Sequence, residues 1–495
     1  MSAIRKTIKV QNGEDMRSTI VEYMRMRYSR IKAAYMEQRE HLSSRIGFLL
    51  LSAGCAIGIG NIYRFPIMTG VYGGGFFVLF YLLFLILLGL PVMTMELSVG
   101  RGSQASLYRC FEKLEKKGSK WHWWKYFSIG GCYMLMMCYT TISAWLLLYF
   151  FKYLKGDILE LKSAEALSEN FSQMVAKPGP QIIAVFAIII TGFGLCAVGL
   201  NKGVESVSKY LMSALLILVL GMGIYCVSTM SGAGEGMKFY LVPSAERLQK
   251  QGILETVTAA MNQAFFTLSL GIGCIAIFGS YIGRERTLLG ESVAIISLDT
   301  FVALLSGFIL FPACFTYNGG VDAGSDVGAS FLFTTFASVF NNMKGGRIFG
   351  ILFFLLLMMA AFSTVIAVFE SIMGFWLEAT KLGRVKSAVI NAVLLCVFSL
   401  PAIFSNNIWS DITIGGNGFM DLEDKIVSML LLPVGSIVFV LFCMSRYGWG
   451  FEKFLAEVNV GKGPKLKRCF RFYMTWILPL IVAGVLVIGI VQSFL

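Results

Sequence analysis

Two glycine-rich stretches interrupt otherwise apolar runs of this sequence, at residues 54–61 and 266–273. A glycine within a helix costs about 1 kcal/mol relative to alanine, so such clusters predict local unwinding. Unwound backbone exposes carbonyls and amides that cost several kcal/mol when buried, unless ions or polar ligands satisfy them. A small cation and a zwitterion would satisfy both kinds of group. Glycines used only for close helix packing are the alternative interpretation.

A second group of residues that could bind ions or ligands consists of polar side chains within apolar runs. Ser363 and Thr364 are adjacent and follow Ala360, where their hydroxyls either bind a cation or bond back to a preceding carbonyl. Arg64 and Glu370 are charged residues within predicted spans, and such residues are functional by default. The sequence assigns no role to Glu370 beyond a buried hydrogen bond or a water cavity.

The elements that carry these residues are predicted to be membrane-spanning helices. The 495 residues are 56% hydrophobic and only 14% charged, far from the roughly 25% charged residues of soluble domains. Continuous apolar runs exclude a transmembrane β-barrel, whose strands alternate. The predicted spans are 46–69, 75–98, 126–151, 180–199, 206–229, 253–282, 288–314, 347–377, 387–404, 425–445 and 472–493.

The net charge of +13 is distributed unevenly along the chain. Most of the 42 Lys and Arg residues lie in residues 1–45 and in every second loop after them. This asymmetry follows the positive-inside rule and excludes nucleic-acid binding. It predicts a multi-pass protein of the plasma (inner) membrane, with a cytoplasmic N-terminus and an extracytoplasmic C-terminus.

The positions of the cysteines and histidines exclude several classes of enzyme chemistry. The eleven cysteines lie mostly in apolar spans and form no CxxC pair, so neither a disulfide framework nor a zinc site is predicted. Both histidines lie in polar segments, which leaves no nucleophile–base pair within the membrane. The protein is therefore not expected to be an enzyme.

The two breaks occur at equivalent places in two halves of the chain. We expect a cytoplasmic segment at 1–45, a first five-span repeat at 46–229, a second at 253–445 and an eleventh span at 472–493. Five-span units enter the membrane from opposite sides, so the repeats would be inverted. A binding site is then expected between the breaks, at the membrane midplane.

Three motifs resemble the neurotransmitter:sodium symporter family. They are GIGNIYRFP at 58–66, GGG at 73–75 and QAFFTLS at 263–269, two of which fall at the predicted breaks. The resemblance implies an all-α polytopic membrane protein with the 5+5 inverted-repeat leucine-transporter fold. Helices 1 and 6 are broken in this fold, and the chain adds one C-terminal span, as in bacterial eleven-span amino-acid transporters.

The resemblance also implies two sodium sites built of oxygen ligands, as a hard cation requires. The first comprises the substrate carboxylate with Ala56, Asn61, Thr267 and Asp299. The second comprises the carbonyls of Gly54, Ile57 and Ala360 with the hydroxyls of Ser363 and Thr364.

The implied substrate is a neutral amino acid. Gly58 stands where amine transporters of the family place an aspartate, and glycine leaves room for an α-carboxylate. The carboxylate would contact Gly60 and Tyr139, and the ammonium the carbonyls of Ala56, Phe266 and Thr267. Leu135, Phe266, Ile272 and Val368 would form an apolar side-chain pocket, which favours hydrophobic or aromatic substrates. Ser269 and Thr364 complete the expected substrate site.

Charged residues around this site are implied to act as gates. Arg64 and Asp424 would form the outer gate, Arg39 and Glu378 the inner gate, and Glu96 would brace the second break. No chloride is expected to be required, because Asp299 supplies a fixed carboxylate where a neutral Asn is usual. Ala303 stands where the leucine transporter has its fixed glutamate.

These features predict a sodium-coupled secondary active symporter that works by alternating access. Two Na⁺ ions, an amino acid and the lipid bilayer are the expected partners, while the oligomeric state is not determined by the sequence. A non-transporting amino-acid sensor on the same scaffold is the alternative. A channel is disfavoured, because channels usually assemble a pore from repeated filters or charge rings.

Overall fold

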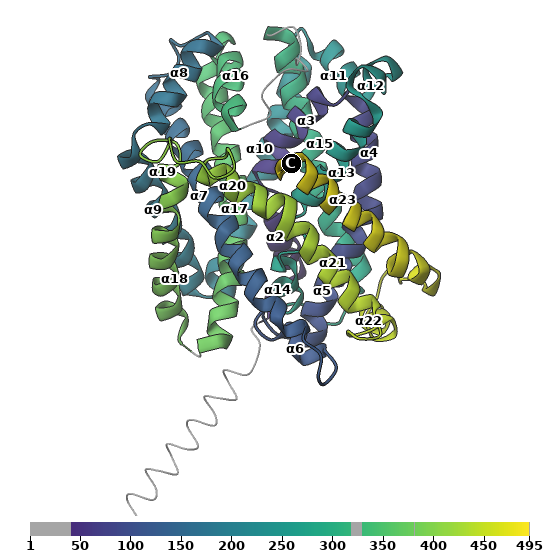
Figure 1. The fold of residues 1–495 in the computed structure, drawn as a ribbon. Coiled ribbons are helices and arrows are strands. Elements are labelled where there is room, and N and C mark those ends of the chain that lie inside the picture. Colours follow the sequence, from purple (N-terminus) through teal and green to yellow (C-terminus); the bar gives the residue numbers. More distant parts are fainter. Residues whose placement is uncertain (1–40, 318–328, 381, 495) are drawn as a thin grey trace, which may run out of the picture. The chain divides into compact units, whose positions relative to one another are not determined.

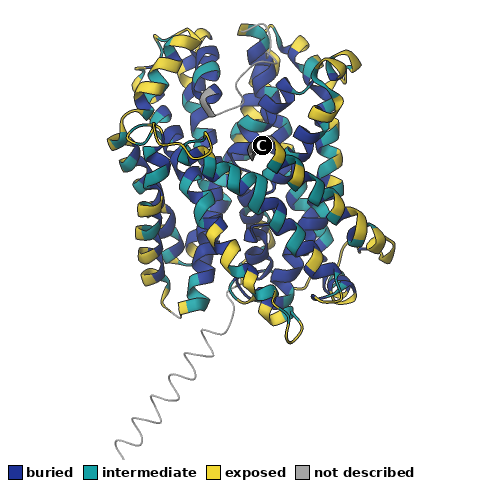
Figure 2. Cartoon of the chain, in the orientation of Figure 1, coloured by how far each residue is buried: buried dark blue, intermediate teal, exposed yellow. Residues whose placement is uncertain are grey.

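A computed structural model describes residues 41–317, 329–380 and 382–494, which form helices joined by turns and contain no β-strand (Figure 1). Residues 1–38 and Arg39 therefore lie outside the described residues. Buried side chains fill the middle of the bundle, and exposed ones lie at its ends and along its outer sides (Figure 2).

The first helix is broken, as the sequence predicts. α2 (Arg45–Ala56) ends at the glycine-rich stretch, and the chain resumes in a π-helical turn, η1 (Gly60–Arg64), that leads into α3 (Phe65–Val71). The two arms differ in direction by 61°. Ser44 caps α2, because its hydroxyl accepts a hydrogen bond from the Gly47 amide.

The rest of the first half consists of continuous helices. In chain order these are α4 (Gly75–Phe84), η2 (Leu85–Gly89), α5 (Leu90–Ser103), α6 (Cys110–Leu114), η3 (Trp121–Trp123), α7 (Trp124–Lys155), α8 (Ala164–Val175), α9 (Pro178–Val198), η4 (Leu200–Glu205), α10 (Ser206–Thr229), α11 (Ala233–Leu241) and α12 (Ala245–Gln251). The segments α4–η2–α5, η3–α7 and η4–α10 each form one long membrane-length helix.

The second half begins with the other broken helix, α13 (Ile253–Thr267) and α14 (Cys274–Gly279). The following elements are α15 (Leu288–Tyr317), α16 (Ala329–Asn342), α17 (Gly346–Thr380), α18 (Arg384–Phe398), α19 (Leu400–Phe404), α20 (Phe419–Lys425), η5 (Ile426–Leu431), α21 (Leu432–Met444), α22 (Phe451–Val458), η6 (Arg468–Phe470), η7 (Tyr473–Ile477) and α23 (Leu478–Phe494). α7 and α17 pack along each other more extensively than any other pair of helices in the described chain.

Within the described residues, nine helical segments are long and apolar enough to cross a membrane, and the bent α2–α3 pair makes a tenth. The expected sixth span, 253–282, is divided between α13 and α14, and neither part alone has the length of a span. Because of this break, the sixth span contains no single helix that is long enough to cross a membrane.

The fifth span begins earlier than the predicted residue 206, in the π-helical turn that contains Glu205. A charged residue can be buried there because its carboxylate accepts hydrogen bonds from the Ser43 amide at 2.8 Å and the Ser43 hydroxyl at 2.7 Å. The tenth span likewise begins at Phe419 rather than 425.

Candidate functional site

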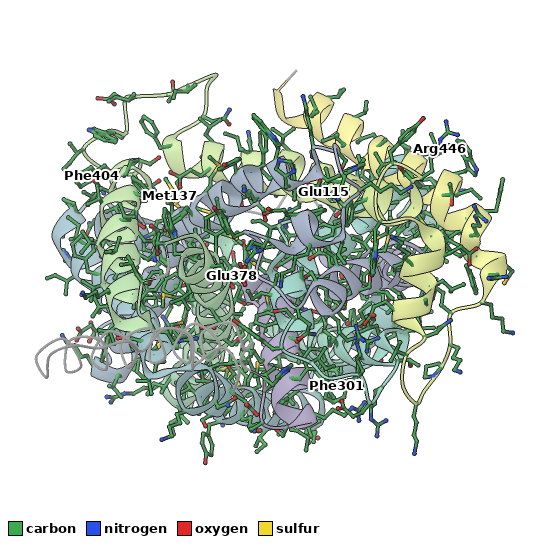
Figure 3. The ribbon with its side chains drawn as sticks, turned by 90° about the horizontal axis from the view of Figure 1, so that it is seen from below. Glu115, Met137, Phe301, Glu378, Phe404 and Arg446 are labelled. Atoms are coloured by element: carbon green, nitrogen blue, oxygen red, sulfur yellow. The ribbon has the colours of Figure 1, made fainter. Side chains whose placement is uncertain are left out.

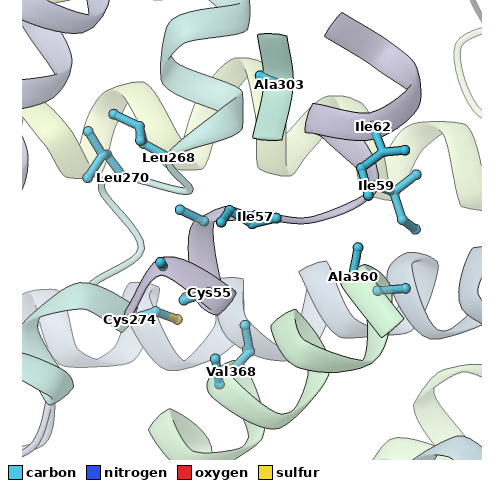
Figure 4. Packing of buried hydrophobic residues seen from close by; sticks show 14 of the residues in the cluster. Cys55, Ile57, Ile59, Ile62, Leu268, Leu270, Cys274, Ala303, Ala360 and Val368 are labelled. Atoms are coloured by element: carbon cyan, nitrogen blue, oxygen red, sulfur yellow. The ribbon is translucent and has the colours of Figure 1, made fainter. Parts of the chain in front are cut away.

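Two side chains, one local and one from α7, form hydrogen bonds with the unwound backbone after α2. The Gly58 amide donates to Asn61 Oδ1 at 3.1 Å, and the Ile59 amide donates to Tyr139 Oη at 3.2 Å. Figure 4 shows the extended stretch at Ile57, with Ile59 beyond it. Two amides without a helical partner are thus satisfied, one locally and one by α7.

At two glycines of this break, a side chain could be added only if neighbouring side chains moved. A Cβ atom on Gly58 would lie 2.6 Å from Tyr139 Oη and 3.1 Å from Thr364 Oγ1. A Cβ atom on Gly60 would lie 2.8 Å from the ring of Phe266. The bare backbone of the first break therefore contacts α7, α17 and the second break directly.

The break between α13 and α14 has a different basis. Ser269, Gly271 and Gly273 have φ angles of +49°, +97° and +90°, which lie in the left-handed region. Glu96 on α5 accepts a hydrogen bond from the Gly271 amide, and Ser128 donates to the Ile272 carbonyl. Glu96 would brace the second break through this contact with the Gly271 amide.

The residues implied for the first sodium site converge between the two breaks. Asn61 Nδ2 donates to Asp299 Oδ1 at 2.7 Å, and Thr267 Oγ1 donates to Asp299 Oδ2 at 3.3 Å. All three side chains are buried, and Ala56 lies just before the first break. A carboxylate, an amide oxygen and a hydroxyl form a donor set that suits a hard cation.

The residues implied for the second site also lie together, where α17 crosses the end of α2. Ser363 Oγ and Thr364 Oγ1 each donate to the Gly54 carbonyl at 3.1 Å. Thr364 Oγ1 is also 3.5 Å from the Ile57 carbonyl oxygen and 3.4 Å from that of Ala360. Three carbonyls and two hydroxyls thus face one another, and Figure 4 places Ala360 close to the first break.

A cavity of about 300 Å³ opens beside both breaks. Its lining includes most of the predicted substrate residues: Ala56, Gly58, Gly60, Leu135, Tyr139, Phe266, Thr267, Ser269 and Thr364. Ile272 and Val368 do not line it and are buried. Apolar residues that the sequence did not single out also contribute to the lining: Met68, Ile142, Met420, Val427 and Leu432.

Arg64 and Asp424, the implied outer gate, both line this cavity. Within the described residues they form no ion pair shorter than 4 Å, and the Arg64 guanidinium instead lies 4.0 Å from the centroid of the Phe266 ring. This cation–π contact places the positive charge directly above the second break.

The opposite end of the molecule carries two further acidic residues on α17. Glu378 Oε1 accepts from the Ser106 amide at 2.8 Å, and the view from below places Glu378 towards the middle of the bundle (Figure 3). Arg39, its implied partner, lies outside the described residues. Glu370, which the sequence left without a role, pairs with Arg384 at 2.7 Å and accepts from the Tyr281 hydroxyl at 2.9 Å.

Sequence reasoning missed the contacts that hold the N-terminal end of α2. Arg45 pairs with Glu291 on α15 at 3.0 Å, and the buried Glu205 accepts from Ser43 and Ser44. The run Ser43-Ser44-Arg45 before a span is a weak signal, because the partners of these residues lie more than 150 residues away in the chain.

Near Asp299 lie two buried polar residues, Tyr81 and Gln263, which the resemblance aligns with residues that hold chloride in eukaryotic members of the family. Gln263 Nε2 donates to the Gly60 carbonyl at 3.2 Å, whereas Gln263 Oε1 and Tyr81 Oη make no hydrogen bond to a described residue. Ala303, one turn after Asp299, is buried and offers only a methyl group.

Two broken helices that face each other across a central cavity, within a bundle of apolar helices, define the leucine-transporter fold. The crystal structure of MhsT in complex with L-phenylalanine has this architecture, with a TM-score of 0.79 and 31% identity, over 92% of this chain and 100% of that one. The expected fold is confirmed.

The chain belongs to the sodium:neurotransmitter symporter family, whose model matches residues 39–163 and 159–494. It is 30% identical to the uncharacterized sodium-dependent transporter YhdH of Bacillus subtilis, over 88% of this chain and 92% of that protein. It is also 24% identical to the sodium-dependent serotonin transporter of Drosophila melanogaster, over 91% and 76% of the two chains. The protein is thus a multi-pass membrane protein of a transporter family, not of an enzyme family.

Proposed function

We propose that this protein imports a neutral, hydrophobic or aromatic amino acid together with sodium, by alternating access. The observation that carries the proposal is the buried cluster of Asp299, Asn61 and Thr267, which joins both broken helices beside the central cavity. A cation held there would complete its shell with the substrate's carboxylate. Sodium and substrate would then bind as one unit.

An amino acid, rather than an amine, is the substrate class that the first break supports. Gly58 has no room for a carboxylate side chain, since even a Cβ atom would meet Tyr139 and Thr364. A carboxylate at the first break must then come from the ligand, in addition to the fixed charge of Asp299. Tyr139, Gly60, Leu135 and Phe266 line the space that the ligand would occupy, and the similar protein MhsT binds phenylalanine.

The second cage, formed by Gly54, Ile57, Ala360, Ser363 and Thr364, is proposed to hold a second sodium. It contains no formal charge and joins α2 to α17. A cation there would stabilise the contact between the end of the first broken helix and a continuous helix. We therefore propose two sodium ions per substrate.

Chloride independence is proposed on the basis of Asp299. A carboxylate about 4 Å from sodium contributes roughly 4 kcal/mol of Coulomb energy at an effective dielectric constant of 20. That fixed charge would replace a mobile anion, even though Tyr81 and Gln263 occupy the equivalent of chloride-binding positions.

The gates and the orientation complete the proposal. Arg64 with Asp424 would close the cavity on the outer side, and Arg39 with Glu378 on the inner side. The N-terminus would be cytoplasmic and the C-terminus extracytoplasmic in the inner membrane, because basic residues predominate at the N-terminal end and in every second loop. The two inverted repeats would span 46–229 and 253–445.

Counterflow in proteoliposomes tests this function. We expect saturable, sodium-dependent exchange of amino acids such as Leu, Phe or Trp, retained when gluconate replaces chloride, with no response to tryptamine or tyramine. Binding without flux would indicate a sensor, and non-saturating conductance a channel. A chloride requirement of the wild type would overturn the role of Asp299 while leaving symport intact.

Asp299→Asn sharpens the experiment on the same preparation. The variant should lose transport or become dependent on added chloride, and a serine at position 303 should favour the second outcome. Unchanged sodium and chloride dependence would show that the first cage is assigned wrongly.

A further inference from the structure

A second cavity, separate from the central one, lies on the outer surface of the bundle between α10 and the beginning of α17. Its volume is about 490 Å³, within the range of small-molecule sites. Met222 and Phe349 form its floor and are only 5% and 6% exposed, whereas Ile217 and Ile348 at its sides are 72% and 67% exposed. The cavity is therefore a deep apolar groove that opens sideways.

The direction in which the groove opens is towards the lipid. α10 belongs to one apolar membrane-length helix and α17 to another. Exposed apolar side chains on membrane-length helices face the hydrocarbon of the bilayer. A ligand that enters sideways from this environment has to be lipid-soluble.

Gly221 gives the groove its depth. A Cβ atom at this position would have no neighbouring atom within 4 Å, so the glycine leaves open space rather than allowing close packing. The same holds for Gly345 at the turn before α17. Larger residues at these two positions would fill the groove.

One end of the groove is positively charged. Lys344 is the one charged residue that lines it, and it is exposed. Arg347 follows in the first turn of α17, where its guanidinium donates to the Leu154 carbonyl at 2.6 Å. Arg347 does not itself line the groove, whereas Lys344 does and forms no ion pair within the described residues, so the Lys344 charge is available to an anionic group.

We propose that this groove is a binding site for an anionic glycerophospholipid, with one acyl chain against Met222 and Phe349 and the phosphate against Lys344. The apolar floor recognises the chain and the charged end selects the headgroup. A zwitterionic lipid would fill the same space with less charge complementarity. This inference is independent of the proposed substrate.

The bound lipid would stabilise the contact between α10 and α17, which pack together in the bundle. Both helices also contact the first broken helix further along, since Met212 on α10 and Ser363 on α17 both lie against Gly54. The lipid would thus rest on the two helices that flank the proposed second sodium site.

Native mass spectrometry of the full-length protein tests the proposal, after detergent washing and titration with phosphatidylglycerol or phosphatidylethanolamine. We expect the wild type to retain one phosphatidylglycerol, with phosphatidylethanolamine retained less. Gly221→Phe should abolish retention of both lipids. Lys344→Glu should weaken the binding of phosphatidylglycerol at least about fivefold, because one charge near a membrane surface contributes about that factor. The binding of phosphatidylethanolamine should not change.

Matched controls are available on the same chain. Gly194→Phe adds the same side chain to another open position, on α9, and Lys155→Glu reverses an exposed charge in the last turn of α7, outside the groove. Both should bind like the wild type. If Gly221→Phe does not fold, Gly221→Leu replaces it as a smaller filler. Equal retention of the two lipids, or wild-type retention in Gly221→Phe and Lys344→Glu, would overturn the proposal.

Discussion

The two broken helices interrupt the bundle at equivalent places but do so by different physical means. The first break keeps ordinary backbone angles at its glycines and is bounded by side chains from α7, α17 and α13, which leave no room for a Cβ atom. The second break passes through the left-handed region at Ser269, Gly271 and Gly273. Glycine thus provides space in the first break, and both space and conformation in the second, where a Cβ atom on Gly273 would lie 2.4 Å from the Leu107 side chain.

Comparing the two breaks therefore distinguishes a glycine substitution that only removes space from one that also strains the backbone. Filling space beside a cavity should affect what the cavity binds, because the side chains around it can move. Forcing a left-handed residue into another conformation should affect folding itself, because the backbone has no alternative path. The following predictions are ordered by the size of the expected effect.

The largest effect is expected for Gly271→Ala. Its φ of +97° is strained for alanine, and the added Cβ would lie 2.0 Å from the Leu432 carbonyl oxygen. Strain and overpacking together should destabilise the protein by roughly 3 kcal/mol. Thermal unfolding in detergent measures this loss. Gly194→Ala, at an open helical position, should be neutral or stabilising, and equal stability of the two variants would contradict the argument.

Gly58→Ala should show the opposite pattern. The new methyl group displaces the Tyr139 hydroxyl, which can move because it is the end of a side chain. Substrate affinity should fall by about 2 kcal/mol, roughly thirtyfold, while the unfolding temperature changes little. Equilibrium binding of radiolabelled amino acid checks the affinity. A loss of stability as large as that of Gly271→Ala would remove the distinction between the breaks.

Tyr139→Phe isolates the hydroxyl without adding volume. The Ile59 amide loses its acceptor, and the substrate carboxylate loses a proposed donor. A lost buried partner costs about 1–3 kcal/mol, so the KM for uptake should rise about tenfold at unchanged expression. Tyr149→Phe, which removes a hydroxyl elsewhere on α7 and outside the cavity lining, serves as a matched control. An unaltered KM would place the carboxylate elsewhere.

The smallest effect is expected for Glu96→Gln, because the amide oxygen can still accept from the Gly271 amide. A neutral acceptor in place of a charged one should cost about 1 kcal/mol, whereas Glu96→Ala removes the acceptor and should cost about 2–3 kcal/mol. Thermal unfolding of both variants gives the ratio. Equal effects would mean that Glu96 braces the second break by charge alone.

Much of the site could be predicted because it depends on local sequence. Glycine clusters mark both breaks, and Asn61, Thr267 and Asp299 could be carried over from motifs that are long and specific. The structure brings these three side chains together. The adjacent hydroxyls of Ser363 and Thr364 likewise face the Gly54 carbonyl.

Pairings between distant segments could not be predicted in this way. Nothing near Glu370 in the sequence indicates Arg384 rather than another cation, and Arg64 lies over Phe266 although its charge suggested an acidic partner. Ile272 and Val368 are apolar residues of the right kind, but Ile272 in the unwound stretch and Val368 on α17 are both buried outside the cavity lining. Such outcomes depend on side-chain packing in three dimensions.

α15 contacts the chain on both sides of the first break. Glu291 holds Arg45 before the break, and Asp299 holds Asn61 after it, about two helical turns further along α15. α15 therefore connects the two arms of the broken helix through two contacts of unequal strength. Arg45 is 45% exposed, so salt screens its ion pair, whereas the Asn61–Asp299 contact is buried. The Arg45–Glu291 pair is therefore the weaker attachment, and any separation of α2 from α15 would begin at the N-terminal end of α2 while the buried contact at Asn61 is kept.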